Sequence, residues 1–164
     1  MNWYVLQVMT GEELTVADKL RDHGIAVMVP QERRTIRCGG SWHSKDFVLF
    51  RGYIFVELEY TAEIYHIIRH LPSVIRFLGQ PPEPLWPQEV AWIKLLDQAG
   101  DPLYPTKMIT LPNGKLQPVE GILCDFESEV LRINRHRRQA EVQITFAGHP
   151  HRLKLSINIL NRDV

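Results

Sequence analysis

Residue types able to perform catalysis or to hold a metal are present, but they do not form catalytic patterns. His149 and His151 stand two positions apart, and no third ligand follows at a spacing typical of a metal site. Cys38 and Cys124 are the only cysteines, too few for a disulfide framework or a four-ligand zinc site. The Walker phosphate loop and the G-x-S-x-G, H-E-x-x-H and G-x-G-x-x-G motifs do not occur in the chain. We therefore expect a binding protein that is not an enzyme and that carries no metal and no cofactor.

Cationic side chains gather in two groups near the end of the chain. The first group is Arg132, Arg135, His136, Arg137 and Arg138, and the second is His149, His151, Arg152 and Lys154. Because the formal net charge of the chain is zero, any contact with nucleic acid must be local. If the two groups lie at facing hairpin ends, they form one patch that attracts RNA phosphates and presents Arg planes to unstacked bases. The alternative is an ordinary solvated surface.

The run FVLFRGYIFVEL at residues 47–58 predicts a central strand, because it is rich in β-branched and aromatic side chains. Alternation along this strand places Tyr53 and Phe55 on one face and Ile54 and Val56 on the other. The second pair is the better core. The alternative for the aromatic residues is ordinary packing beneath a helix.

Capping residues, apolar periodicity and turn residues predict the elements around this strand. Strands are expected at 3–8, 25–37 and 74–78, and helices at 10–24, 61–72 and 87–100, with a hairpin tip at 38–41. Thr10 and Glu13 have the spacing of a capping box, and Thr61 can cap the second helix. The order strand, helix, strand, strand, helix, strand is the split βαβ arrangement, which gives a four-stranded antiparallel sheet with flanking helices.

Short β-type segments follow the last helix. They lie at 107–111, 121–126, 129–134, 141–146 and 152–159, with turns between them. This pattern suggests a small five-stranded β-barrel. The predicted fold class is therefore α+β, with one domain at residues 1–100, a linker at 101–106 and a second domain at 107–164.

Four segments follow one another with the spacing found in the N-terminal domain of NusG proteins. They are WYVLQV-x-x-G-x-E at 3–13, MVP at 28–30, LFRGYIFVEL at 49–58 and VIRFLG at 74–79. The C-terminal stretch resembles a KOW domain, an SH3-like barrel in which Gly121 would be the characteristic turn glycine. Over essentially its whole length the chain thus resembles the NusG family of transcription elongation and antitermination factors.

The resemblance implies that the first domain binds the coiled-coil clamp helices of the largest RNA polymerase subunit and promotes processive elongation and antitermination. In the family, an apolar and aromatic depression on the sheet receives the tip of these helices. The matching polymerase-binding positions are Gln7, Phe50, Tyr53, Phe55 and Phe77. Because the C-terminal segments carry many β-branched residues, we expect a barrel that does not refold into helices and does not occlude Tyr53.

Basic residues of the first domain are candidates for contact with the displaced non-template DNA strand. They are Lys19, His23, Arg33, Arg34, Arg37 and Arg69. Phosphate contacts by such residues supply salt-sensitive affinity, whereas a solvated charged face is the alternative. Arg51 stands where the family usually has a proline, which suggests a specialised member similar to the antiterminators LoaP and RfaH.

The resemblance also implies partners for the second domain and a location for the protein. In the family this domain contacts ribosomal protein S10 or the terminator Rho, and the basic surface here would suit nascent RNA better. The chain shows no signal-peptide pattern and no apolar run of membrane-spanning length. We expect a monomer in the bacterial cytoplasm, without membrane contact, that reaches the nucleoid through polymerase.

The competing interpretation is an RNA-recognition motif that acts independently of polymerase. That fold has the same strand order, and RGYIFVEL at 51–58 approaches its signature. Against it, Ile54 and Leu58 leave the base-stacking platform incomplete, and the second domain has no role in that interpretation.

Overall fold

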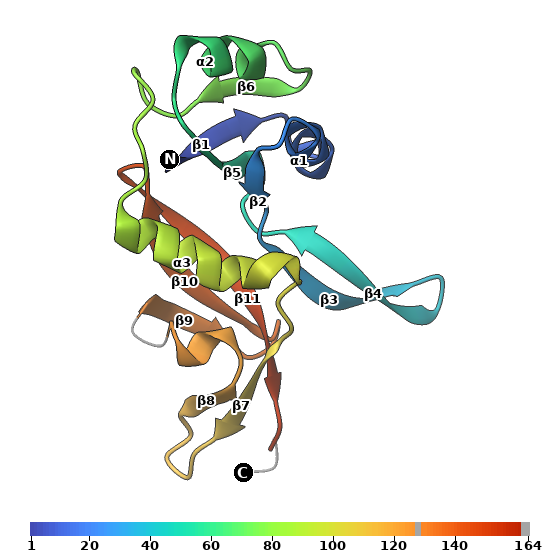
Figure 1. Cartoon of the computed structure of the whole chain (residues 1–164). Helices are drawn as coiled ribbons and strands as arrows, with labels where there is room; N and C mark the ends of the chain where they lie inside the picture. The colour runs from blue at the N-terminus through green and yellow to red at the C-terminus, as the bar shows by residue number, and fades with distance from the viewer. Residues whose placement is uncertain (127–128, 162–164) are drawn as a thin grey trace.

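The computed structural model describes residues 1–126 and 129–161, which form two β-sheets, a projecting hairpin and three α-helices (Figure 1). The N-terminal sheet has the strand order β2-β5-β1-β6 and is antiparallel throughout. Its strands are β1 (Asn2–Val8), β2 (Ala26–Met28), β5 (Tyr53–Leu58) and β6 (Val74–Phe77). The predicted four-stranded antiparallel sheet is confirmed.

Helices α1 (Glu13–Asp22) and α2 (Ala62–Arg69) pack on one face of the N-terminal sheet (Figure 1). The core between them contains apolar side chains of β1, β5 and both helices, among them Leu6, Val8, Val16, Leu20, Ile54, Val56 and Ile68. Alternation along β5 therefore directs its predicted core residues inward. Thr61 caps α2 as predicted, since its hydroxyl accepts a hydrogen bond from the Ile64 amide at 3.1 Å.

The beginning of α1 differs from the prediction. Within the described residues no side chain caps this helix, and Glu12 rather than Thr10 is the N-cap residue. The buried Glu13 carboxylate accepts hydrogen bonds from the backbone amides of Gly11 at 3.0 Å and Gly52 at 3.2 Å. The predicted capping box is wrong because this carboxylate ties α1 to the turn that precedes β5.

The single long strand predicted at 47–58 is also wrong. Strands β3 (Gln31–Cys38) and β4 (Ser41–Val48) form an antiparallel hairpin that projects from the N-terminal sheet, with its tip where the sequence predicts it (Figure 1). The chain then turns before it enters β5, and the Tyr53 amide donates to the Phe50 carbonyl at 3.1 Å. Residue composition favours strand throughout this run, but the turn redirects the chain from the hairpin into the sheet.

Helix α3 (Pro87–Asp97) begins with proline at its first position, as predicted, and is followed by the 3-10 turn η1 (Gln98–Gly100). It contacts β2 of the N-terminal sheet and β10 of the C-terminal sheet. Ile93 and Leu96 of this helix are fully buried. The helix thus lies between the two sheets.

The C-terminal sheet is a curled half-barrel with the strand order β8-β7-β11-β10-β9 (Figure 1). Its strands are β7 (Thr106–Thr110), β8 (Leu116–Glu120), β9 (Val130–Asn134), β10 (Gln139–Phe146) and β11 (His149–Ile159). Strand β11 is antiparallel to β10 and parallel to β7. The predicted α+β class, with a second five-stranded β unit, is confirmed.

The strand predicted at 121–126 is wrong, because this segment forms the 3-10 turn η2 (Ile122–Cys124) and the preceding residues form β8. Gly121 begins the turn with φ at +126°, and a Cβ there would lie 2.8 Å from the Cα and Oγ1 atoms of Thr106. The Leu123 amide donates to this Oγ1 at 3.3 Å. The turn buries both Ile122 and Leu123, which a strand would direct to opposite faces.

One apolar core joins the two sheets. It contains Trp3, Val5 and Phe55 of the N-terminal sheet, Ile93 of α3, and Phe146, Leu153 and Leu155 of the C-terminal sheet, among others. Shared packing therefore crosses the linker predicted at residues 101–106. Among the described residues, no helix has the length and apolar character needed to cross a membrane.

Candidate functional site

Three aromatic residues lie in the turn before β5 and on the strand itself. Phe50 and Phe55 are buried, and Tyr53 is half-buried. The rings of Phe50 and Phe55 lie 5.4 Å apart at 81°. Tyr53 stands opposite Gln7 in the pairing of β1 with β5, and the Gln7 Oε1 accepts a hydrogen bond from Arg76 Nε at 2.8 Å. Four of the five predicted polymerase-binding residues therefore lie on the face of the N-terminal sheet opposite α1 and α2.

Two residues of the C-terminal sheet pack against this face. The ring of Phe146, at the end of β10, lies 5.2 Å from Phe50, 5.3 Å from Phe55 and 6.0 Å from Tyr53. The His151 imidazole of β11 stacks on Phe146 at 3.7 Å and 5°, and it lies 5.7 Å from Tyr53. We call these five residues the aromatic cluster.

The prediction that the C-terminal unit leaves Tyr53 uncovered is wrong. The unit consists of strands, as expected, yet it packs on the predicted polymerase-binding face. Aromatic pairs of this geometry contribute about 0.5–1.5 kcal/mol each beyond the burial of their apolar surface. Alternation along β5 identifies an apolar face but not the partner that covers it, and here that partner belongs to the same chain. We call this arrangement the closed form.

A buried carboxylate provides a second contact between the two halves of the closed form. Glu32 of β3 is 1% exposed, and its Oε1 accepts a hydrogen bond from the Ser156 amide of β11. Its other oxygen lies 2.9 Å from the Arg34 guanidinium, which also donates to the Lys154 carbonyl at 3.4 Å. Leu103, in the predicted linker, extends this contact by pairing its backbone with β3.

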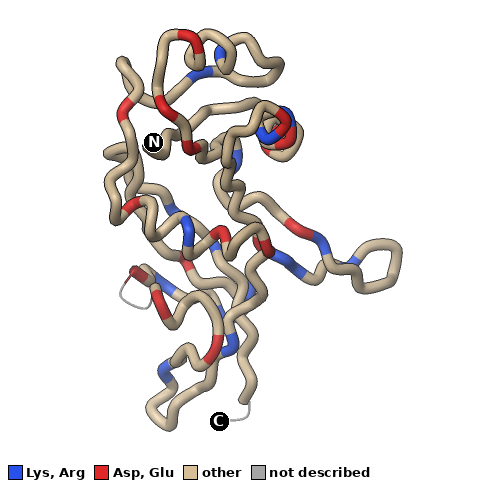
Figure 2. The backbone as a smooth tube through the Cα atoms, in the orientation of Figure 1, with Lys and Arg blue, Asp and Glu red and all other residues tan. Residues whose placement is uncertain are grey.

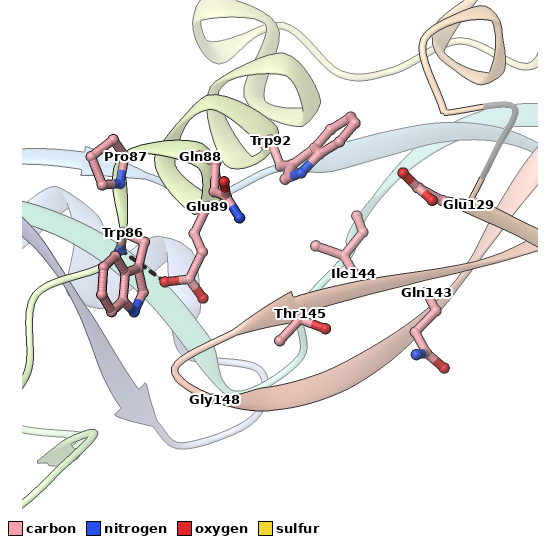
Figure 3. Close-up of a pocket in the computed structure, with 10 residues that line it drawn as sticks. All are labelled: Trp86, Pro87, Gln88, Glu89, Trp92, Glu129, Gln143, Ile144, Thr145 and Gly148. Atoms are coloured by element: carbon pink, nitrogen blue, oxygen red, sulfur yellow. Dashed lines mark hydrogen bonds between the residues drawn. The ribbon is translucent and has the colours of Figure 1, made fainter.

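A hollow of about 890 Å³ lies between the start of α3 and β10 (Figure 3). Trp86 and Trp92 stand on its α3 side, and Thr145 faces them from β10. The Glu89 carboxylate in this hollow accepts a hydrogen bond from the Trp86 amide at 2.8 Å, so it serves as part of the helix cap. The lining residues come from the start of α3 and from the C-terminal half of the chain.

Phe77 does not belong with the other predicted polymerase-binding residues. It is 4% exposed in the core beneath α1 and α2, where its ring stacks on Tyr65 at 5.5 Å and meets Tyr4 edge-on. Its placement on the binding face is a wrong prediction, because β6 presents this side chain to the helical side of the sheet.

The predicted DNA-binding residues are distributed over several elements. Lys19 lies on α1 with His23 just after it, Arg69 ends α2, and Arg33, Arg34 and Arg37 lie on β3. Arg33 is paired with Asp46 at 2.9 Å, and Arg69 donates to the Ile75 carbonyl. The structure therefore brings together only the residues of β3, and part of their charge is already paired.

The turns that carry the two predicted RNA-binding groups do not meet, although Arg132 and Arg137 of the first group line one hollow with Lys154 of the second. Residues 135–138 form the turn between β9 and β10, whereas His149 follows the turn at the other end of β10. In the β10–β11 register, Gln139 pairs with Ser156 and Phe146 with His149, so the whole length of β10 separates the two turns. The expectation of facing hairpin ends is wrong because both turns flank the same strand. His151 lies in the aromatic cluster instead.

The pKa of His151 lies below its ordinary value, because burial disfavours the imidazolium and because His149 adds a nearby positive charge. Among the described residues, no three His, Cys, Asp or Glu side chains gather in a way that could hold a metal ion. The site is therefore an apolar and aromatic contact surface.

Comparison with known proteins agrees with this kind of site. A family model described as "Transcription termination factor nusG" matches residues 1–94, more than half of the chain. The chain belongs to the NusG family. It is a transcription termination/antitermination factor, and NusG proteins are not enzymes. Membership implies RNA polymerase and nucleic acid as partners in general, and it does not favour an independent RNA-recognition motif.

Relatives match along almost the whole chain. The protein is 26% identical to the transcription termination/antitermination protein NusG of Buchnera aphidicola subsp. Acyrthosiphon pisum, over 98% of this chain and 96% of the relative. It is 28% identical to the NusG of Yersinia pestis, over 95% and 93%. A solved structure titled "Domain interaction in Thermotoga maritima NusG" matches with a TM-score of 0.59 and 22% identity, over 95% and 93%, which supports the fold.

Sequence patterns did not predict the contacts between the two halves of the closed form. In the sequence, Phe146 is one apolar residue of an alternating strand. Glu32 is one of several charged residues near the hairpin. A weak signal was available for Glu32, because an acidic residue before two arginines is a candidate for a buried pair. Nothing in the local pattern of β10 distinguishes Phe146 from a residue that packs within its own sheet.

Proposed function

We propose that this protein binds the clamp helices of the largest RNA polymerase subunit through the aromatic face of β5, centred on Tyr53, and promotes processive elongation and antitermination. The observation that carries this proposal is the apolar face itself. Phe50, Tyr53 and Phe55 lie on one side of the sheet, opposite the helices that complete the N-terminal core. Aromatic side chains of this kind dominate protein interfaces, because they offer large rigid surfaces at low entropic cost.

The closed form adds a condition to this binding. Phe146 and His151 occupy the aromatic face, so the clamp helices gain access only when the C-terminal sheet moves away. The apparent affinity then equals the affinity of the open form multiplied by the fraction of molecules that are open. A closed form favoured by about 3 kcal/mol would weaken the apparent affinity by roughly a hundredfold.

We further propose that nucleic acid contacts accompany binding to polymerase. Arg33 and Arg34 of the hairpin are candidates for the non-template DNA strand, and Arg135 to Arg138 of the β9–β10 turn for nascent RNA. Arg33 and Arg34 are partly exposed and residues 135–138 are exposed, so both groups are accessible to nucleic acid. Acting through polymerase, the protein would work in the bacterial cytoplasm at the nucleoid.

The test is co-purification of the full chain with RNA polymerase, with Tyr53→Ala as the variant. Tyr53 is half-buried at the edge of the aromatic cluster, so its truncation should leave the circular dichroism spectrum unchanged. Truncation of an interface aromatic residue typically costs about 2 kcal/mol or more, a loss of roughly thirtyfold in affinity. Leu131→Ala, an exposed apolar truncation on β9, is the matched control. A Tyr53→Ala protein that co-purifies as well as the wild type would contradict the proposal.

A further inference from the structure

Two adjoining hollows form a continuous groove across the boundary between the hairpin and the C-terminal sheet. The first is lined by Arg34, Phe47 and Arg51 from the N-terminal half, and by Arg152 and Lys154 of β11. The second, lined by Arg132 and Arg137 among others, shares Gln139 and Lys154 with the first. We call the two together the basic groove. Figure 2 shows Lys and Arg positions at the base of the hairpin and along the C-terminal sheet.

The basic groove carries an excess of positive charge. Its cations are Arg34, Arg51, Arg132, Arg137, Arg152 and Lys154, whereas Glu141 is the only carboxylate among its described lining residues. Glu141 is already engaged by Arg132 at 2.9 Å and by Arg152 at 3.7 Å. Arg34 is paired with the buried Glu32 outside the groove lining. Within the described part of the chain, the side chains of Arg51, Arg137 and Lys154 make no ion pair.

Strand register places two of these cations, Arg132 and Lys154, on either side of Glu141. Glu141 of β10 pairs with Arg132 of β9 on one side and with Lys154 of β11 on the other. Neighbouring strands lie about 4.8 Å apart, so the span from Arg132 to Lys154 is roughly 10 Å. A span of this length fits a chain of phosphates better than a single small anion.

The groove also contains flat surfaces on which a base could stack. Phe47 is half-buried in its wall, and the Arg34 guanidinium lies 4.9 Å from the Phe47 ring centroid. Unpaired bases stack on aromatic rings and on guanidinium planes, whereas the bases of a duplex are already stacked on one another. Charge and stacking together favour a single-stranded polynucleotide over an acidic protein.

We propose that the basic groove binds single-stranded nucleic acid and that this binding holds the protein in the closed form. Arg34, Phe47 and Arg51 come from one half of the protein, and Arg152 and Lys154 from the other, so only the closed form brings them together. A ligand that binds one form alone shifts the equilibrium toward it by a factor of about 100 at a concentration of 100 times its Kd. Nucleic acid in the groove therefore opposes exposure of Tyr53. The effect of closure on polymerase binding rests on the proposed function, whereas binding of nucleic acid in the groove does not require polymerase.

The experiment measures binding of fluorescent 12-nucleotide RNA and DNA of the same sequence to the full chain by anisotropy, as a function of salt. Arg51→Gln and Lys154→Gln each remove one unpaired, exposed cation, the first from the N-terminal half and the second from β11. Each should weaken binding on the order of tenfold and reduce the slope of log affinity against log salt by about 0.7. The control variant Lys107→Gln/Lys115→Gln removes two charges on β7 and just before β8, away from the groove. It should bind like the wild type.

Closure is measured on the same protein with spin labels on its two native cysteines. Cys38 at the hairpin tip and Cys124 in η2 are both exposed, and they lie on opposite sides of the groove's boundary. Adding the oligonucleotide should increase the population that has the distance of the closed form. The comparison of RNA with DNA identifies which polynucleotide the groove prefers.

Three results would overturn the inference. Loss of binding in Lys154→Gln but not in Arg51→Gln would confine the site to the C-terminal sheet. Equal binding of a polyglutamate peptide, with the same dependence on Arg51 and Lys154, would indicate an acidic protein partner. Absence of oligonucleotide binding would show that the groove is not a nucleic-acid site. Co-purification with polymerase would distinguish that outcome from failure of the proposed function, because the two measurements are independent.

Discussion

The phenol ring of Tyr53, on the N-terminal sheet, lies 5.7 Å from the imidazole of His151 on the C-terminal sheet. Polymerase binding is proposed to depend on Tyr53, and His151 belongs to the C-terminal sheet that covers it. Under the proposed function, polymerase binding and closure compete for one surface. Substitutions that loosen the closed form should have effects on polymerase affinity opposite to those of substitutions on the binding face.

Glu32→Ala should raise the affinity of the full chain for RNA polymerase. The variant removes the acceptor of the Ser156 amide, which is a contact between the two halves of the closed form, and the partner that holds Arg34 near the Lys154 carbonyl. Loss of a buried charged acceptor costs about 1–3 kcal/mol, which would increase the open fraction by roughly 5-fold to 150-fold where the open form is the minor one. Isothermal titration with purified polymerase measures the change. Unchanged or weaker binding by a variant whose circular dichroism spectrum is unaltered would show that closure does not limit access.

Acidification should open the protein through His151. Burial and His149 hold the pKa of His151 below its ordinary value in the closed form, so this form favours the neutral imidazole. Opening returns the ring to water, where its pKa approaches about 6.5. The closed form thus has its full stability above that value and loses it as the pH falls below, because the open form binds the proton more readily.

The distance between spin labels on Cys38 and Cys124, followed from pH 8 to pH 5.5, tests this dependence. A loss of the closed-form distance as the pH falls through about 6.5 is expected for the wild type. His151→Gln keeps a polar side chain without a titrating proton, and it should flatten the curve. An equally steep curve in that variant would assign the titration to another group.

Gly121→Ala should destabilise the C-terminal sheet. A methyl group at this position would lie 2.8 Å from the backbone of Thr106, in a conformation with φ at +126° that side chains rarely adopt. Strain and overlap together should lower the free energy of unfolding by about 2–4 kcal/mol. Gly114→Ala is the matched control, because φ there is +84° but no atom lies within 4 Å of the added carbon, so the loss should be nearer 1 kcal/mol. Thermal unfolding measures both, and equal losses would show that the contact with Thr106 is not limiting.

The sequence predicted the parts of the fold that local patterns determine. Thr61 caps α2, Pro87 begins α3, and alternation along β5 separates Ile54 from Tyr53, because each depends on residues close in the chain. Glu13 was misassigned, since its carboxylate bonds to Gly52, a residue distant in sequence that no local spacing reveals.

The same reasoning explains the errors at the candidate site. The composition of β10 and β11 predicts strands, but it does not predict that Phe146 packs against Phe55 across the two sheets. Phe77 and Tyr53 look alike as aromatic residues on strands, and only the direction in which β6 presents its side chains separates them. Prediction of the covered face requires knowledge of how the two sheets pack, which is a property of the whole chain.

The most direct test of the central claim is the distance between spin labels on Cys38 and Cys124, measured with and without RNA polymerase. Both native cysteines are exposed, so labelling requires no change at the aromatic cluster. If polymerase binds the face that Phe146 covers, saturating polymerase should replace the narrow distance distribution of the closed form by a different and broader one. Binding of polymerase with the closed distance unchanged would contradict the claim that Tyr53 and its neighbours form the binding surface.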